Sequence, residues 1–393
     1  MMGFFVSLNT DRHVRHPGVV FLALSTLMIL VSVGLFNTYI GLRLSADSVS
    51  EVWIGSLFSA YYLGLVLGGR VAHRLIIRVG HIRAYVAAAS LSAIMVLAQT
   101  LTDEIVIWLA LRLVAGVCLV TQYVVIESWL NEQTDNTKRG RVFAVYLVMS
   151  GLGTAMGQLV ITMYPTLDIR PLTFVAMCQA AAMIPIALTM RTHPAAQLPA
   201  PLDLRFFFKQ VPMVLVTMFL AGNISATFYG LAPGFAAKMG MSTAEVAVFV
   251  STAVIAGLLA QWPMGWLSDQ MNRAKLIRTN ALILMALAIL MTGWLDLPWP
   301  LMLLVSAGTG VMQFTFYALA SSYAYDNVSA ERRMGMSAVL LMVYGVGASM
   351  GPLIAGAMMR VGGPSMFYVF TTVCALVLFL VMGARRNSAA SAG

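Results

Sequence analysis

The stretch Ile105–Leu130 reads IVIWLALRLVAGVCLVTQYVVIESWL and carries only two full charges, Arg112 and Glu127. It is long enough to cross a bilayer as a helix, and its apolar residues do not alternate with the period of two that a strand requires. A charged side chain at the bilayer centre costs at least about 2.5–3.5 kcal/mol, so it normally faces a protein interior or a water-filled cavity. The stretch therefore predicts a transmembrane helix, and it predicts that the rest of the chain shields Arg112 from lipid.

The composition of the whole chain supports a membrane location. The 393 residues are 60% hydrophobic and 10% charged, whereas a soluble domain carries roughly 25% charged residues. Lipid admits only helices and closed barrels, and the long apolar runs indicate an all-α membrane protein. The three cysteines lie inside apolar runs and form no CxxC pair, so no disulfide, metal site or cofactor is expected.

Twelve apolar runs are predicted to be membrane-spanning helices. The first is expected to be a retained helix, because it is too long for the apolar segment of a signal peptide. Gly and Pro residues lie between the runs or at their ends. The runs cover residues 19–42, 51–72, 82–102, 105–130, 141–164, 171–190, 211–236, 243–267, 276–295, 299–324, 334–359 and 364–384.

The distribution of Lys and Arg predicts the orientation. Most of the 24 basic residues fall on the side of the N-terminus, and the opposite side holds only Arg43, Arg170, Lys238 and Arg360. Because loops rich in Lys and Arg stay in the cytoplasm, we expect a multi-pass membrane protein with both termini cytoplasmic. The net charge of +9 then reflects topology, and no nucleic-acid partner is expected.

The chain divides into two related halves. The segment Met149–Leu159 matches Val343–Leu353 at an offset of 194 residues, and the same offset pairs Gly116 with Gly310. The one long connection, residues 191–210, is rich in Pro and Ala. The expected domains are therefore a six-helix bundle over 1–190, a cytoplasmic linker over 191–210 and a second six-helix bundle over 211–393. Two parallel repeats of this kind are the layout of one class of transporters.

A loop motif carries a family resemblance. Residues Gly265–Lys275 read GWLSDQMNRAK, which resembles the G-x-L-x-D-x-x-x-R-x-K signature of the major facilitator superfamily. A carboxylate at a helix end can accept hydrogen bonds from basic side chains and so latch helices together, which assigns Asp269 and Arg273 to a cytoplasmic gate. The resemblance covers essentially the whole chain and implies 12 transmembrane helices in two pseudo-symmetric six-helix halves. Within the family the chain is similar to a little-characterised bacterial YcaD-like group, which implies a location in the bacterial cell inner membrane and no substrate.

The corresponding loop of the first half departs from the family pattern. Ile77 stands where the family has Asp. The resemblance implies that an acid at the cytoplasmic end of the fourth helix pairs with loop arginines, so we expect Glu127 to pair with Arg78, Arg83 or Arg139 and close the gate. The alternative is that Glu127 carries a proton.

Two further motifs bear on the direction of transport. Arg112 followed by Gly116 resembles the R-x-x-x-G pattern of the family's fourth helix, and Gly351–Gly356 resembles its G-P-x-x-x-G antiporter element. That element lies on the eleventh helix, however, and Gln158 replaces the proline on the fifth. The departure weakens the inference to antiport.

The family fold implies that helices one, four, seven and ten line a central path. Polar residues on these runs share helix faces, and the candidate residues for substrate binding or coupling are Asn37, Arg112, Tyr123, Asn223, Thr227, Gln313 and Tyr317. The alternative is that the amides only join helices by hydrogen bonds. For Arg112, the alternatives are a coupling residue and a buried Arg that holds backbone carbonyls and tyrosines together.

These features predict a secondary active transporter that moves a small organic molecule across the inner membrane by alternating access, with proton-coupled export as the leading hypothesis. The expected partners are that molecule, protons and the lipid bilayer, and a monomer is expected. The chain has no GxxxxGK[ST] loop, so ATP is not expected to drive it directly. Uptake of a nutrient by proton symport and a non-transporting membrane sensor or assembly protein remain as alternatives. An enzyme is not expected, because no paired carboxylates, HExxH or Ser/His set lies at membrane depth.

Overall fold

The computed structural model describes residues 17–132, 139–188, 204–293, 295–329 and 332–390. Within these ranges all regular structure is helical. The helices are α2 (Pro17–Ala46), α3 (Glu51–Val79), α4 (His81–Ala98), α5 (Ile105–Glu132), α6 (Arg139–Val160), η1 (Ile161–Met163), α7 (Arg170–Ala181), α8 (Met183–Ala187), α9 (Leu204–Gln210), α10 (Pro212–Lys238), α11 (Thr243–Gln270), α12 (Arg273–Leu290), α13 (Trp299–Asp326), α14 (Arg333–Gly362) and α15 (Met366–Ala390).

Eleven helical segments in the described ranges are long and apolar enough to cross a membrane. One of them, Arg170–Ala187, comprises both α7 and α8. The remaining helix of the bundle is α12, which is 18 residues long. Its first turns hold Arg273, Lys275 and Arg278, and these charges lower its mean hydropathy. The predicted fold class, an all-α membrane protein built from two six-helix halves, is confirmed.

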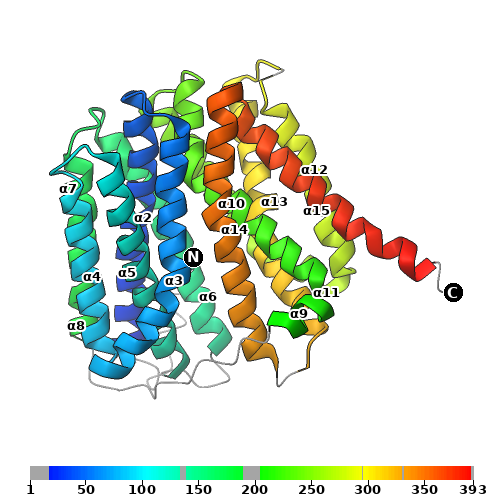
Figure 1. Ribbon diagram of the computed structural model, residues 1–393, viewed down its shortest axis with the longest axis horizontal. Coiled ribbons are helices and arrows are strands. Elements are labelled where there is room, and N and C mark those ends of the chain that lie inside the picture. Colours follow the sequence, from blue (N-terminus) through cyan, green and yellow to red (C-terminus); the bar gives the residue numbers. More distant parts are fainter. Residues whose placement is uncertain (1–16, 133–138, 189–203, 294, 330–331, 391–393) are drawn as a thin grey trace, which may run out of the picture.

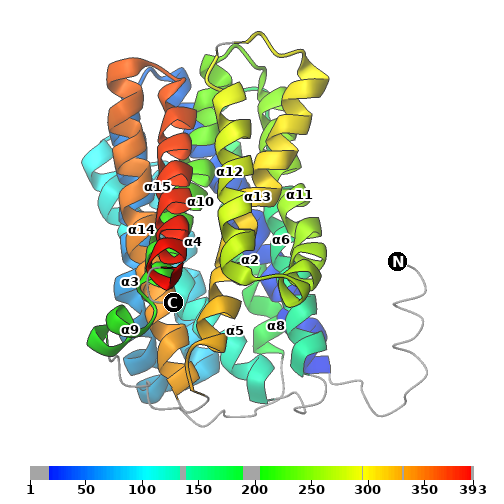
Figure 2. The same cartoon turned by 90° about the vertical axis from the view of Figure 1, so that its right-hand side faces the viewer.

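The helices of each half gather on one side of the bundle (Figure 1). In the first half α3 packs on α5 and α2 packs on α6, while in the second half α11 packs on α13 and α10 packs on α14. The view in Figure 2 faces the second half, with α12, α13 and α15 toward the reader. The halves meet mainly where α3 packs on α14, α6 on α11 and α2 on α10.

The internal repeat predicted from the sequence is visible in the packing of glycines. A Cβ atom added to Gly157 of α6 would lie 2.1 Å from a carbonyl oxygen of α2, and one added to Gly351 of α14 would lie 2.4 Å from a carbonyl oxygen of α10. Gly116 of α5 and Gly310 of α13 approach the backbones of α3 and α11 in the same way, at 2.1 and 2.0 Å. Such small residues allow membrane helices to pack backbone against backbone, and both halves use them at equivalent positions.

At the end of the bundle where α2 ends and α3 begins, the two halves are in close contact. A Cβ on Gly55 of α3 would lie 2.1 Å from the carbonyl oxygen of Pro352, and one on Gly356 of α14 would lie 2.3 Å from that of Glu51. Lys238, in the last turn of α10, forms an ion pair with the Glu51 carboxylate. We call these five residues the seal. It joins the two halves at this end of the bundle.

The segment predicted as a linker ends in the short helix α9. This helix lies beside one end of the second half, at a steep angle to the long helices (Figure 2). Phe207 is buried there in a cluster with Leu215 of α10, Ala324 of α13 and Val339 of α14. The rest of the predicted linker, up to residue 203, lies outside the described residues.

Candidate functional site

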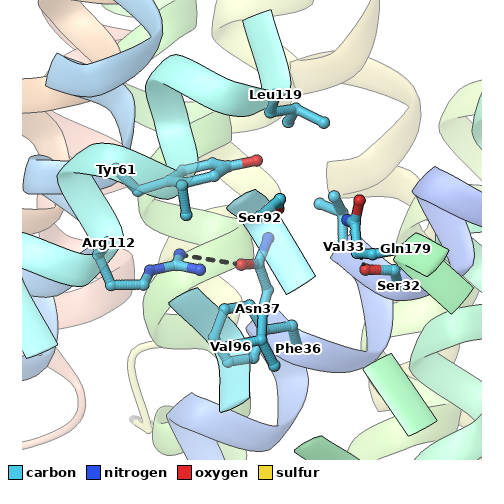
Figure 3. Close-up of a pocket in the computed structure, with 11 residues that line it drawn as sticks. Ser32, Val33, Phe36, Asn37, Tyr61, Ser92, Val96, Arg112, Leu119 and Gln179 are labelled. Carbon is cyan, nitrogen blue, oxygen red and sulfur yellow. Dashed lines mark hydrogen bonds between the residues drawn. The ribbon is translucent and has the colours of Figure 1, made fainter. Parts of the chain in front are cut away.

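The side chain of Arg112 is enclosed by protein. It projects from α5 and is 1% exposed. Its Nη2 donates a hydrogen bond to Oδ1 of Asn37 on α2, at 3.2 Å (Figure 3). Two of the seven candidate site residues, 75 positions apart in the chain, are thus in direct contact. The prediction that the chain shields Arg112 from lipid agrees with this burial.

Three aromatic rings surround the guanidinium. Its Cζ lies 4.8 Å from the ring centroid of Phe36, 5.1 Å from that of Phe58 and 4.3 Å from that of Tyr61. Each cation–π contact is worth about 0.5–2 kcal/mol, the larger figure applying where water is excluded. Phe58 also contacts the second half, because a Cβ on Gly230 of α10 would lie 2.7 Å from its ring. Phe58 therefore takes part both in enclosing the Arg112 charge and in the contact between the halves.

A small cavity adjoins the guanidinium (Figure 3). Its volume is about 20 Å³, and its polar lining includes Ser92 of α4 and Gln179 of α7. Gln179 donates a hydrogen bond from Nε2 to Ser32 Oγ at 2.8 Å. A polar cavity of this size has room for a water-sized particle. All of its lining residues come from α2, α3, α4, α5 and α7, so it lies inside the first half and not between the halves.

The candidate residues of α10 contact α14. Nδ2 of Asn223 donates to the carbonyl oxygen of Phe219 at 2.9 Å, and it lies 3.0 Å from the Cβ position of Gly347. Thr227 is fully buried, with its Oγ1 2.8 Å from the Cβ position of Gly351. The hydrogen bond of Asn223 stays within α10, and the contacts with α14 are packing contacts, so the interhelical hydrogen bonds weighed as the alternative stay a prediction.

The candidate residues of α13 have different surroundings. Gln313 is 3% exposed, and its Nε2 has no hydrogen-bond partner among the described residues. Tyr317 is 38% exposed and packs edge-on against Tyr344 of α14, with ring centroids 5.3 Å apart. Tyr317 is therefore open to its surroundings, whereas Gln313 is buried.

Glu127 is exposed near the end of α5 opposite the seal. Tyr146 of α6 donates a hydrogen bond to its Oε1 at 3.3 Å. The carboxylate also lies within electrostatic range of Tyr123 on its own helix and of Tyr317 in the second half. Glu127 therefore lies near both halves, at the end of the bundle away from the seal.

Arg78 and Arg83, two of the other predicted gate residues of the first half, are exposed. Arg78 and Arg83 lie where α3 ends and α4 begins, and no ion pair joins either of them to Glu127 within the part of the chain that the structure describes. The side chain of Arg139 lies outside the described residues. Pairing of Glu127 with a loop cation stays a prediction.

The gate motif of the second half centres on Arg273. From the first position of α12, its Nη2 donates to Asp269 at the end of α11 at 3.0 Å, and its Nη1 donates to Asp326 at the end of α13 at 2.7 Å. Nη1 also donates to the carbonyl oxygen of Ser322 at 2.7 Å. Arg273 is the less exposed partner, since 19% of its side chain is exposed against 74% for Asp269. In this state the latch joins three helices of the same half.

Sequence reasoning missed three features of these sites. Asp326 was not singled out, although the 194-residue offset pairs it with Glu132 at the end of α5. Phe58 was also missed, because spacing along α3 does not say that its ring lies opposite Arg112. The ion pair of Glu51 with Lys238 had no local signal, because its members are 187 positions apart.

Comparison with known proteins places these sites in a family context. The family model described as Major Facilitator Superfamily matches residues 20–325 and, in a second match, 214–392. An uncharacterised MFS-type transporter of Yersinia pestis (strain Pestoides F) is 26% identical over 366 residues, covering 93% of this chain and 94% of that protein. The uncharacterised MFS-type transporter YcaD of Escherichia coli O139:H28 is 27% identical over 370 residues, covering 92% and 94%.

Solved structures share the fold at low identity. A crystal structure of the nucleoside transporter NupG matches with a TM-score of 0.75 at 15% identity, covering 93% of this chain and 98% of that one. A bacterial homologue of the human lysosomal transporter Spinster, in an inward-facing and occupied conformation, matches with a TM-score of 0.73 at 14% identity, covering 92% and 96%.

Proposed function

From the premise that the chain belongs to the Major Facilitator Superfamily and is a secondary transporter, not an enzyme, we propose that it exports a small organic molecule in exchange for protons. The observation that carries this proposal is the enclosed Arg112, with Asn37 and three rings around it. Charged residues inside a membrane are costly and mark substrate or ion pathways. In this proposal Arg112 couples the bound substrate to proton movement.

Alternating access accounts for the asymmetry between the two ends of the bundle. The seal joins the halves at one end, while Glu127 is exposed toward both halves at the other. The Lys and Arg distribution places the sealed end outside the cell. We therefore assign this structure to an inward-facing state with both termini in the cytoplasm. Transport requires the seal to part when the halves rock the other way.

The gate at the cytoplasmic end is assigned to the residues that the sequence indicated. Asp269 and Arg273 hold the second half together there, and in the outward-facing state we expect Glu127 to meet the basic residues Arg78, Arg83 or Arg139. Because these partners lie in the same half as Glu127, such an ion pair requires the helix ends of the first half to rearrange as the bundle closes at this end. The gate then stabilises one state of the cycle and must break for the other.

The substrate is expected to be largely apolar. Aromatic side chains lie near Glu127. Tyr123 of α5 and Tyr317 of α13 are within its electrostatic range, and Tyr344 of α14 packs against Tyr317. Sites for small molecules are mostly apolar, with a few polar groups that fix orientation. The nucleoside specificity in the name of NupG is a property of that protein and does not enter this assignment.

Flux measurements in right-side-out membrane vesicles test the proposal. Ligands are first found by a thermal-shift screen of metabolites and drugs on the purified protein, and a radiolabelled hit is then loaded into vesicles. Acidifying the outside should accelerate loss of the hit in vesicles that contain the protein. Accelerated uptake instead would indicate symport, and no protein-dependent flux of any hit would favour a sensor or assembly protein.

A further inference from the structure

The guanidinium of Arg112 is a buried positive charge with little protein acceptor around it. A guanidinium carries five N–H donors, and among the described residues it makes one hydrogen bond, to Asn37. Its Nε has no partner there. Its other close contacts are with the faces of Phe36, Phe58 and Tyr61, which attract a cation but leave its donors unpaired.

No carboxylate neutralises this charge within the described part of the chain. None of the ion pairs found there involves Arg112. The ionisable groups that act on it are the phenols of Tyr61 and Tyr62. Buried charges in proteins are normally paired, because an isolated one loses its hydration without compensation. Arg112 therefore lacks the negative partner that its burial calls for.

The adjoining cavity has the room for that partner, and a few polar groups among its mainly apolar lining face it. Asn37 accepts from Arg112 through its oxygen, and its amide nitrogen points the other way, toward Ser92 (Figure 3). The Ser92 side chain lines the cavity, and a hydroxyl can donate as readily as it accepts. A volume of about 20 Å³ is above the roughly 10–15 Å³ that a single water requires. We propose that this cavity binds one compact, singly charged anionic group, held by Arg112 and the Asn37 amide.

Two sources offer such a group: a free halide ion and the carboxylate end of a small organic acid. The chemistry of recognition is the same in both. The role of the bound anion rests on the proposed transport function, but the binding itself does not. Binding to the purified protein is measured without any flux. If the protein carries out flux but binds no anion, the anion site is overturned and the transport function stands. If it binds the anion but shows no flux, the transport function is overturned and the anion site stands.

Thermal unfolding of the full-length protein in detergent tests the site. The protein is purified in sodium sulfate, and chloride, bromide, formate or acetate replaces sulfate at constant ionic strength. We expect chloride and bromide to raise the apparent Tm saturably, by about 2–4 °C, as a ligand that binds only the folded state does. A larger rise with formate and acetate than with chloride would identify the carboxylate of an organic acid as the source.

An internal carboxylate provides the decisive variant. Asn37→Asp places a negative charge of the same shape 3.2 Å from Nη2 of Arg112, so it should abolish the dependence of Tm on the added anion without unfolding the protein. Arg112→Gln should abolish it as well. The matched control is Asn327→Asp, the same exchange at the end of α13, where the side chain donates to Tyr323. It should keep the full anion dependence of the wild type.

Two results would overturn the assignment. One is a wild-type Tm that is the same in sulfate and in all four test anions. The other is an anion-dependent rise that persists at full size in Asn37→Asp and Arg112→Gln, since the ion would then bind elsewhere. If Arg112→Gln fails to fold, Asn37→Asp decides the question alone, because a merely structural Arg112 predicts no difference in anion dependence between Asn37→Asp and the wild type.

Discussion

Gly55→Ala should weaken the seal and shift the transporter toward its outward-facing state. The Cβ atom that the substitution adds would lie 2.1 Å from the carbonyl oxygen of Pro352 and 2.8 Å from its carbonyl carbon. Ordinary contacts of a Cβ begin at 3.4 Å, so α3 and α14 have to move apart by roughly 1 Å here. The atom it meets is backbone, and a side-chain rotation cannot relieve the overlap.

The size of the shift follows from the cost of overpacking. An extra carbon in a well-packed contact costs about 1–3 kcal/mol. In the outward-facing state the halves separate at this end and the cost disappears, so the closed state alone is penalised. A difference of 1–3 kcal/mol changes the ratio of the two states by about 5- to 150-fold. Gly356→Ala, which would meet the carbonyl oxygen of Glu51 at 2.3 Å, should act in the same direction.

Cysteine labelling from outside the cell measures the shift. Ser45→Cys places a thiol near the contact of α2 with α10, since Ser45 lies 3.8 Å from the Cβ position of Gly234. The native cysteines Cys118, Cys178 and Cys374 are buried and give little background. The rate of reaction with a membrane-impermeant maleimide should rise with the outward-facing fraction, up to 150-fold at the upper limit.

Gly69→Ala is the matched control for this experiment. Gly69 lies on the same helix, α3, and a Cβ there would meet nothing within 4 Å. Both substitutions gain the same helix propensity of about 1 kcal/mol, so the difference between them isolates the overlap with Pro352. Equal labelling rates for Gly55→Ala and Gly69→Ala, in proteins that remain monodisperse, would refute the reasoning that this contact closes the outer end.

Three further substitutions address the proposed coupling and gate residues. Arg112→Ala should abolish flux of an identified substrate while the protein stays folded, because it removes the coupling charge; wild-type flux would rule that role out. Glu127→Gln should change the pH dependence of flux if Glu127 carries the proton, and an unaltered pH profile would leave it only the gate role. Asp269→Asn removes one of the two carboxylate acceptors of Arg273 and, by loosening the cytoplasmic end of the second half, should raise labelling of cysteines placed there. An unchanged accessibility pattern would count against the latch.

The fold could be predicted from the sequence because each membrane-spanning helix is recognisable as a local run of apolar residues. Runs such as Ile105–Leu130 must satisfy their backbone hydrogen bonds internally, and the repeat at an offset of 194 marks the two halves. The break between α7 and α8 at Ala182 has its signal in Pro185. A proline has no N–H to donate to the carbonyl four residues earlier, here that of Ala181, and its ring crowds that carbonyl.

The partners of the site residues could not be predicted in the same way. Spacing along one helix places Arg112 on a face, but it does not say which rings of α2 and α3 lie opposite. The sequence suggested tyrosines and carbonyls as partners for Arg112, and the structure adds Phe36 and Phe58. The pairing of Glu51 with Lys238 depends on how the halves meet. That arrangement changes during a transport cycle, so no single pattern in the sequence specifies it.

Phe58 connects the buried charge to the closure of the outer end. Its ring lies 5.1 Å from the guanidinium of Arg112 and also fills the space above Gly230 of the second half. When the seal parts, α10 leaves this ring, and Phe58 loses the support that holds it against the charge. The enclosure of Arg112 is then weaker in the outward-facing state by up to one cation–π contact, about 0.5–2 kcal/mol. A ligand that neutralises Arg112 lowers the free-energy cost of losing this contact, and it therefore favours the outward-facing state. By this route a charge inside the first half can bias the movement of both halves, although it does not lie between them.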